Sequence, residues 1–181
     1  MRSSFFSAAV AAGEMLSPAR NTLTRTKEKT PEVNVVNERP RIGVFVCRCG
    51  TNIAGVVDVP SVAEYAKSLP FVEYATDNLY ACSQDTQEKI KEKIQEHRLN
   101  RVVVASCSPR THEPLFQETM REAGLNRYLF EMANIRDQCS WVHMHEKEEA
   151  TSKSRDLIRM AVANVRLRRS LLTSPSCLLS E

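Results

Sequence analysis

The stretch RVVVAS, residues 101–106, decides the fold class. After its arginine the segment runs through apolar, mostly β-branched residues with no charged residue among them. A strand with one face in water alternates apolar and polar residues, whereas a strand buried on both faces is a continuous apolar run. Sheets that are buried on both faces are mostly parallel and covered by helices. RVVVAS therefore predicts a central strand of a parallel sheet.

Strand-like and helix-like segments alternate on both sides of this strand. Further predicted strands are RIGVFV (41–46), FVEYATD (71–77) and YLFEMANI (128–135). Predicted helices cover 60–69, 83–99 and 113–125, with Pro60 in a first turn, Ser83 as an N-cap and Gly124 at a C-cap position. This alternation predicts an α/β fold with a roughly four-stranded parallel sheet and covering helices.

The chain divides into four predicted parts. Residues 1–40 show no sustained period and match a signal or transit peptide only weakly, so a disordered or non-native extension is expected. Residues 41–146 form the α/β domain. Residues 147–169 carry the apolar stripe of a long C-terminal helix, which we expect to link toward a further domain. Residues 170–181 have Ser and Pro interruptions and are expected to form an irregular tail.

Composition excludes several classes of function. The 181 residues are 42% hydrophobic and 26% charged, as in an ordinary soluble protein. The net charge of +3 is too small to indicate nucleic acid binding, and no apolar run approaches the length of a membrane span. The five glycines form neither a dinucleotide-binding fingerprint nor a phosphate loop. We expect a cytoplasmic protein.

Most of the six cysteines follow predicted strands or lie in the loops beyond them. These are Cys47, Cys49, Cys82, Cys107 and Cys139. Because the carboxyl ends of parallel strands meet at one edge of a sheet, where ligands bind in open α/β folds, we expect the five thiols at that edge. The sixth, Cys177, lies in the tail and is treated as unrelated.

Clustered cysteines in a chain with a good apolar core indicate metal or redox chemistry rather than structural disulfides. One C-x-C pair and three single cysteines match neither paired zinc knuckles nor the common ferredoxin spacings. An iron–sulfur cluster, however, needs only four thiolates that converge in space. A strained, oxidising disulfide between Cys47 and Cys49 is one alternative, and unrelated core cysteines are another.

Side chains next to Cys107 are secondary candidates. Ser108, Arg110 and His112 follow it directly. Hydroxyl donors near cluster sulfurs tune the reduction potential, and Arg110 is a candidate to neutralise an anionic cluster or to contact a partner. The alternative is that Arg110 and His112 only cap or solvate the loop. No Ser-His-Asp set or carboxylate pair is evident, so no catalytic residue is predicted.

Longer phrases of the sequence resemble a known family. CRCGTNIAGVVDV, NRVVVASCSPRTHEPLFQ, AGLNRYLFEMANIRDQCSWVH and KSRDLIRMAVANVRL resemble the N-terminal domain of the heterodisulfide reductase A-subunit, over about residues 41–167. The resemblance implies a [4Fe–4S] cluster in this domain. For the full-length family it implies a following FAD domain and ferredoxin-like modules, within a methanogenesis-related complex that passes electrons to a heterodisulfide or a similar acceptor.

The resemblance carries the cluster-binding role to the five cysteines, of which four would ligate iron. It favours Cys82, Cys107 and Cys139 together with either Cys47 or Cys49. The implied partners are other heterodisulfide reductase-type subunits or the missing FAD domain, with no nucleic acid and no membrane span. FAD is expected only in the full-length family.

The chain stops at Glu181, before any FAD domain, and changes abruptly to RRSLLTSPSCLLSE after the family-like phrases. We therefore expect a fragment of a longer reading frame rather than a stand-alone module. Such a piece is expected to transfer electrons as part of an oxidoreductase and not to be catalytic alone. A docking module without a cluster, or a thiol–disulfide oxidoreductase, is the alternative.

Overall fold

A four-stranded parallel sheet forms the centre of the domain, as predicted. The computed structural model describes residues 2–20, 22 and 30–170. The strands are β1 (Ile42–Cys47), β2 (Val72–Asn78), β3 (Arg101–Ser106) and β4 (Phe130–Asn134). Their order in the sheet is β2-β1-β3-β4, and every neighbouring pair is parallel. All four carboxyl ends therefore lie at the same edge.

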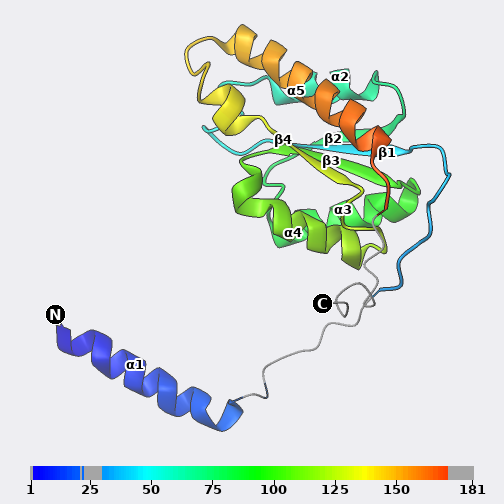
Figure 1. Ribbon diagram of the computed structural model, residues 1–181. Helices are drawn as coiled ribbons and strands as arrows, with labels where there is room; N and C mark the ends of the chain where they lie inside the picture. The colour runs from blue at the N-terminus through cyan, green and yellow to red at the C-terminus, as the bar shows by residue number, and fades with distance from the viewer. Residues whose placement is uncertain (1, 21, 23–29, 171–181) are drawn as a thin grey trace, which may run out of the picture.

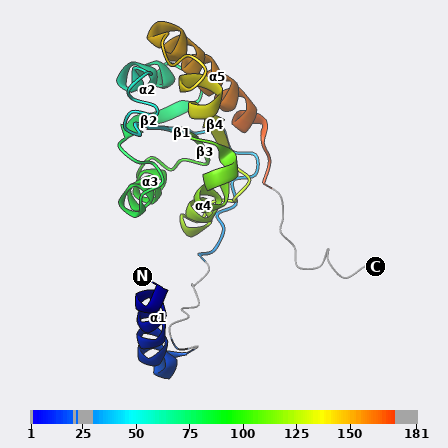
Figure 2. The same cartoon turned by 90° about the vertical axis from the view of Figure 1, so that its left-hand side faces the viewer.

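Helices cover both faces of this sheet. The helices of the domain are α2 (Val59–Lys67), α3 (Gln84–Glu96), α4 (Pro109–Glu122) and α5 (Lys147–Leu167). Helices α2 and α5 lie on one face, and α3 and α4 lie on the other (Figures 1 and 2). A single π-helical turn, Arg136–Ser140, connects β4 toward α5. The predicted α/β class and the long C-terminal helix are confirmed.

Burial explains why the central strands have continuous apolar sequences. Every residue of β1 and β3 is buried, whereas β2 at the edge of the sheet has one buried residue, Ala75. Helices on both faces leave the central strands no contact with water, so each position of RVVVAS and IGVFVC packs inside. At Gly43 the space is so restricted that an added Cβ would lie 2.4 Å from Leu99 Cδ1.

The helix boundaries differ from the predicted ones by a few residues, most of all at the start of α4. Helix α4 begins at Pro109, earlier than the predicted residue 113, because Ser108 takes the extended N-cap conformation and Pro109 fits the first turn. Pro114 then lies inside the helix. Helix α5 ends at Leu167 instead of 169, since Arg168 is extended and its side chain pairs with Glu131.

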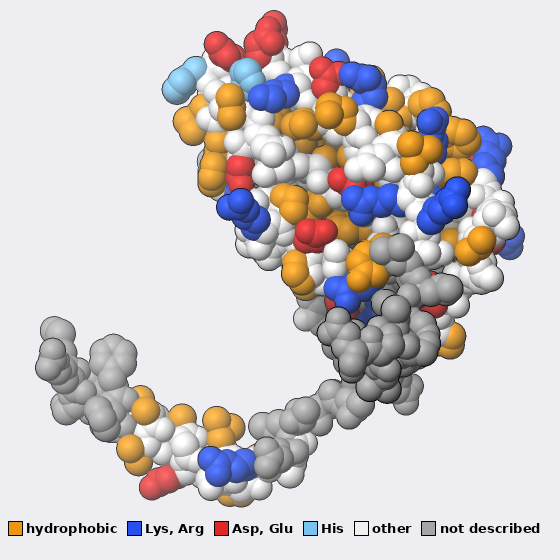
Figure 3. Space-filling model, in the orientation of Figure 1, with side chains coloured by type: hydrophobic (Ala, Val, Ile, Leu, Met, Phe, Trp, Pro, Cys, Tyr) orange, Lys and Arg blue, Asp and Glu red, His pale blue; other side chains and the backbone are white. Residues whose placement is uncertain are grey.

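The segment before the domain contains a helix, α1 (Arg2–Leu16), followed by a 3-10 turn, Ser17–Ala19. Helix α1 stands apart from the sheet in both ribbon views, and the side chains of residues 7–16 are exposed (Figures 1 to 3). Residues 30–36 instead contact the domain, where the Val33 amide donates to the Gly124 carbonyl at 2.8 Å. The interpretation of 1–40 as a disordered or non-native extension stays a prediction.

The predicted irregular tail and Cys177 lie outside the described residues, apart from Ser170. Among the helices that the described part of the chain forms, none is long and apolar enough to cross a membrane.

Candidate functional site

The carboxyl edge of the sheet gathers the predicted cysteines, although their environments differ. Cys47 is the last residue of β1 and is buried, and Cys49 follows it in the next loop, half-buried. Cys107 directly follows β3 and is also half-buried. Cys82 lies in the loop between β2 and α3 and is exposed. Of the described cysteines, all five are free thiols.

Electrostatic coupling shows which thiols lie close together. Burial raises the pKa of Cys47 to about 11, and the charges of Cys49 and Cys82 add to the rise. Burial also raises the pKa of the Cys107 thiol, again with a contribution from Cys82, while Arg136 acts in the opposite direction. Cys82 thus lies near both Cys47 and Cys107, and Cys49 lies near Cys47. These four cysteines are called the thiol group below.

Cys139 is separate from the thiol group. It is fully buried in the π-helical turn, and its Sγ donates to the Ala150 carbonyl in the first turn of α5, at 3.0 Å. Burial raises the pKa of Cys139 to about 11, and the charge that acts on it is that of Lys153. The structure therefore places this thiol against α5, where it links the turn after β4 to the helix.

The two sides of the sheet separate Cys139 from Cys47. Cys47 shares a face of β1 with Phe45, because alternate residues of a strand point the same way. The Phe45 ring contacts Tyr74, which stacks on His97 at the end of α3. That face belongs to the α3–α4 layer, whereas Cys139 bonds to the α5 layer.

Two buried polar groups at the same edge lack partners. The Nδ2 of Asn78 and the hydroxyl of Ser106 have no hydrogen-bond partner of acceptable geometry among the described residues. Asn78 ends β2 beside Cys47, and Ser106 ends β3 just before Cys107. The Ser106 hydroxyl still lies near enough to lower the pKa of the Cys107 thiol. Both donors are thus available to an acceptor held by the thiol group.

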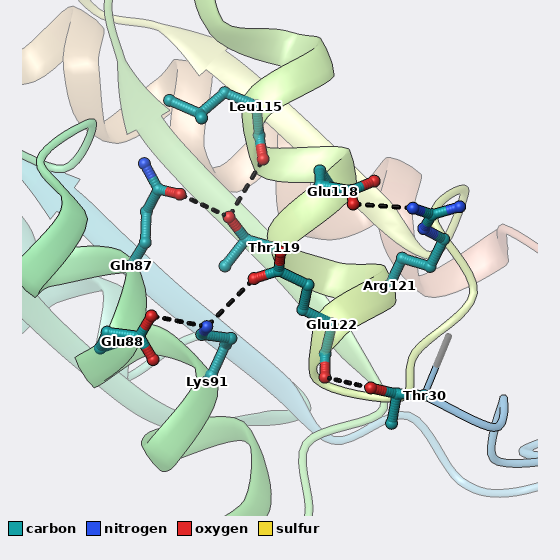
Figure 4. Close-up of polar contacts among 9 residues, drawn as sticks. All are labelled: Thr30, Gln87, Glu88, Lys91, Leu115, Glu118, Thr119, Arg121 and Glu122. Carbon is teal, nitrogen blue, oxygen red and sulfur yellow. Dashed lines mark hydrogen bonds and ion pairs between the residues drawn. The ribbon is translucent and has the colours of Figure 1, made fainter. Parts of the chain in front are cut away.

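Gln87 fixes the loop that carries Cys82. Its Nε2 donates to the Cys82 carbonyl at 2.9 Å. Its Oε1 accepts from the Thr119 hydroxyl of α4 at 3.0 Å, as Figure 4 shows. The same hydroxyl contacts the Leu115 carbonyl one turn earlier. This side chain therefore ties the exposed cysteine loop to both helices of its layer, and nothing in the sequence pattern had indicated it.

The groove between α3 and α4 begins at Cys82 and encloses about 790 Å³. Lys91, which lines this groove, forms ion pairs with Glu88 at 2.8 Å and with Glu122 at 3.0 Å (Figure 4). The pairs raise the pKa of Lys91. The Lys91–Glu122 contact joins α3 to α4, and together with the Gln87–Thr119 hydrogen bond it holds in place the helix layer next to Cys82.

A further set of interacting side chains that the sequence did not predict lies after β4. Arg136 pairs with Asp137 at 2.8 Å, and its guanidinium lies 4.6 Å from the centre of the Trp141 ring. A hydrogen bond from Ser108 contributes to the lowered pKa of Asp137, after the larger contribution of Arg136. Ser108, predicted beside the site, is therefore part of this network.

The other two predicted neighbours of Cys107 lie on the first turn of α4. Arg110 is exposed and His112 is half-buried. Their proposed roles beside the site stay predictions. The structure instead brings Arg136 to the thiol group, and the pKa of Arg136 is raised mainly by its hydrogen bond to Asp137 and further by the charges of Cys107 and Cys49.

Comparison with known proteins reveals close relatives for most of this domain. The second A-type iron-sulfur subunit of the CoB–CoM heterodisulfide reductase of Methanopyrus kandleri is 60% identical over 139 residues, which are 77% of this chain and 21% of that protein. The chain is homologous to part of the heterodisulfide reductase A-subunit. A protein of Archaeoglobus profundus that is named as similar to this A-subunit is 56% identical over 133 residues, 74% of this chain and 19% of that protein.

A further relative supports the same assignment. The A-subunit of the H₂:CoB–CoM heterodisulfide,ferredoxin reductase of Methanothermobacter thermautotrophicus is 58% identical over 130 residues, 72% of this chain and 20% of that protein. The chain spans about a fifth of the length of these curated relatives. No family model matches the chain. The predicted resemblance to the heterodisulfide reductase A-subunit is confirmed.

The donor set of this heterodisulfide reductase-type domain fits an iron–sulfur cluster better than a single metal ion. Within the described residues, no three His, Cys, Asp or Glu side chains lie close enough to hold one ion. A cluster differs because each thiolate bonds a separate iron, so its ligands surround the cluster instead of meeting at one point. Four neighbouring thiols supply the number of ligands that such a cluster needs.

Proposed function

We propose that this domain is an electron-transfer module that holds a [4Fe–4S] cluster through the thiol group. The observation that carries the proposal is the convergence of four cysteines at the carboxyl edge of the sheet, from the chain segments that follow β1, β2 and β3. An iron–sulfur cluster is held by four thiolates and requires no compact motif. The names of two relatives, which call them iron-sulfur subunits or ferredoxin reductase subunits, support the same cofactor.

The proposed ligands are Cys47, Cys49, Cys82 and Cys107. Electrostatic coupling connects Cys49 to Cys47, Cys47 to Cys82, and Cys82 to Cys107, so each of the four has another of them as a neighbour. Cys139 has no such coupling and already donates its hydrogen to Ala150. We therefore assign Cys139 to the attachment of α5, in place of the ligand role that the family resemblance favoured for it.

The unpartnered donors support a sulfur-rich acceptor at this edge. An unsatisfied buried donor costs about 1–3 kcal/mol, so the unpartnered amide of Asn78 at this sheet edge calls for an explanation, and the Ser106 hydroxyl at the same edge already acts on the Cys107 thiol. Sulfur atoms of a cluster accept such bonds, and the bonds raise its reduction potential. Asn78 and Ser106 are thus the proposed hydrogen-bond donors to the cluster.

Electron transfer within a larger assembly is the role that the relatives suggest. They are named as A-subunits of reductases that act on the CoB–CoM heterodisulfide, and one name includes ferredoxin. We propose that this domain passes electrons between such subunits or domains. No flavin step is assigned to these residues.

A thiol–disulfide activity is less well supported by the site. The thiolate is the attacking species in disulfide exchange, and burial raises the pKa of Cys47 to about 11. At neutral pH this thiol is protonated, so Cys47 is a poor nucleophile. An iron ion bonded to sulfur, by contrast, displaces the proton directly.

Anaerobic reconstitution with iron and sulfide tests the proposal. The chain is expected to take up about four iron and four sulfide per protein and to give the EPR spectrum of a one-electron-reduced [4Fe–4S] cluster after dithionite treatment. Protein that retains only trace iron, with all of its thiols still titratable, contradicts the proposed function. A chain from which iron is stripped by a chelator provides the matched baseline.

A further inference from the structure

Arg136 occupies a place between two loops of the thiol group. The amide of Ile135 donates to the Ser106 carbonyl at 2.9 Å, so the chain that leaves β4 runs beside the end of β3. The residue after Ser106 is Cys107, and the residue after Ile135 is Arg136. The backbone therefore brings the start of the π-helical turn next to Cys107.

The other end of the same turn contacts the loop of Cys49. The Ser140 hydroxyl donates to the Asn52 carbonyl at 2.5 Å, and Trp141 Nε1 donates to Asn52 Oδ1 at 3.3 Å. Asn52 lies in the turn that the Cys49 carbonyl closes with Ile53, at 3.0 Å. The turn Arg136–Ser140 thus connects the Cys49 loop to the end of β3.

The Arg136 side chain is held in this position by two contacts. Its Nε donates to Asp137 Oδ1 at 2.8 Å, and its guanidinium lies over the Trp141 ring at 4.6 Å. The side chain is 23% exposed, so its charge is only partly screened by water. Asp137 is fixed in turn, because its amide donates to Asn134 Oδ1 at 2.9 Å and Ser108 bonds its carboxylate.

The charge of Arg136 acts on the thiols that it faces. It lowers the pKa of Cys107 against the larger, opposite effect of burial. In return, the charges of Cys107 and Cys49 contribute to the raised pKa of Arg136, after the larger contribution of Asp137. Nearby, the ion pair of Arg48 with Asp77 at 3.5 Å is more exposed and therefore more screened.

We propose that Arg136 sets the reduction potential of the cysteine site: its held positive charge stabilises the reduced form of the cluster without ligating iron. The inference rests on the proposed function. An external one-electron donor adds one negative charge to the cluster on reduction, and a fixed cation beside the cluster favours that state. Asp137 offsets part of this effect, so the two side chains act on the potential with opposite sign.

The test compares reduction potentials by EPR-monitored redox titration of the full chain, reconstituted anaerobically at neutral pH. Arg136→Gln is expected to keep its iron and sulfide content but to disfavour reduction at least threefold, about 28 mV at 59 mV per tenfold change. Arg136→Lys keeps the charge and is expected to stay closer to the parent. Asp137→Asn is expected to shift the potential in the positive direction.

Arg110→Gln is the matched control, since Arg110 is an exposed arginine on the first turn of α4, shortly after Cys107. Its potential is expected to equal that of the parent. An unchanged potential in Arg136→Gln, or an equal shift in Arg110→Gln, overturns the inference while leaving the cluster in place. If Arg136→Gln does not fold, the sign of the Asp137→Asn shift decides, and a negative shift there overturns it. A parent chain that takes up no cluster refutes the proposed function itself, and this inference with it.

Discussion

Replacing Cys139 with alanine separates its structural role from a ligand role. The substitution removes a fully buried sulfur and the 3.0 Å hydrogen bond to the Ala150 carbonyl. The bond contributes about 0.5–1.5 kcal/mol, and burial of one atom of this size contributes about 0.8 kcal/mol. We expect Cys139→Ala to lower the free energy of unfolding by about 1–2 kcal/mol, which corresponds to about 2–8 °C in Tm for a chain of this length.

Cys82→Ala provides the opposite pattern, because Cys82 is exposed and its thiol supports no packing. Without a cluster its stability is expected to change by less than about 0.5 kcal/mol. After reconstitution, however, Cys82→Ala is expected to lose the cluster, and Cys139→Ala is expected to keep it. Urea unfolding of the cluster-free proteins and iron counting of the reconstituted ones measure the two quantities. A folded Cys139→Ala protein that binds no iron refutes the assignment, as does a Cys82→Ala protein with full iron.

Three further predictions concern packing, loop anchoring and pH. Gly43→Ala places a Cβ 2.4 Å from Leu99 Cδ1, so overpacking is expected to lower the free energy of unfolding by about 1–3 kcal/mol; an unchanged melting temperature contradicts this. Gln87→Ala removes the bond to the Cys82 carbonyl and is expected to shorten the half-life of the cluster in chelator severalfold; equal decay rates refute the anchoring role. In the cluster-free chain, the pKa of Cys47 is raised from 9.0 to about 11, so the unfolded state loses this proton first. The protonated Cys47 thiol therefore contributes fully to the free energy of unfolding below pH 9, and this contribution falls by up to about 2–3 kcal/mol as the pH rises to 11. Urea unfolding of the parent and Cys47→Ala proteins across this pH range measures the difference.

The sheet was predictable because its two central strands are continuous apolar runs and strand-like segments alternate with helix-like ones along the chain. The predicted strand 101–106 is β3 itself, and the predicted strand at 71–77 differs from β2 by one residue at each end. The start of α4 was harder to predict, because two prolines near it both suit the first turn of a helix. Pro109 and Pro114 both fit an N-terminal position, and only the extended conformation of Ser108 decides between them.

The edge that holds the cysteines was also predictable, because parallel topology brings every carboxyl end to one side. Spacing along the chain does not say which layer a residue after a strand joins. Cys139 follows β4 as Cys107 follows β3, yet a π-helical turn directs Cys139 against α5. The same turn brings Arg136 to the thiol group, and π-helical turns have no reliable sequence signature. Arg110 was the candidate in the sequence because it follows Cys107 by three residues, whereas the turn that brings Arg136 to Cys107 could not be predicted.

Diffraction at the iron absorption edge, from crystals of the reconstituted chain, locates the bound iron. We expect one compact anomalous peak at the carboxyl edge of the sheet, on the α3–α4 side, bonded to the Sγ atoms of Cys47, Cys49, Cys82 and Cys107. Iron bonded to the Sγ of Cys139, or crystals of folded protein with no iron at this edge, would contradict it.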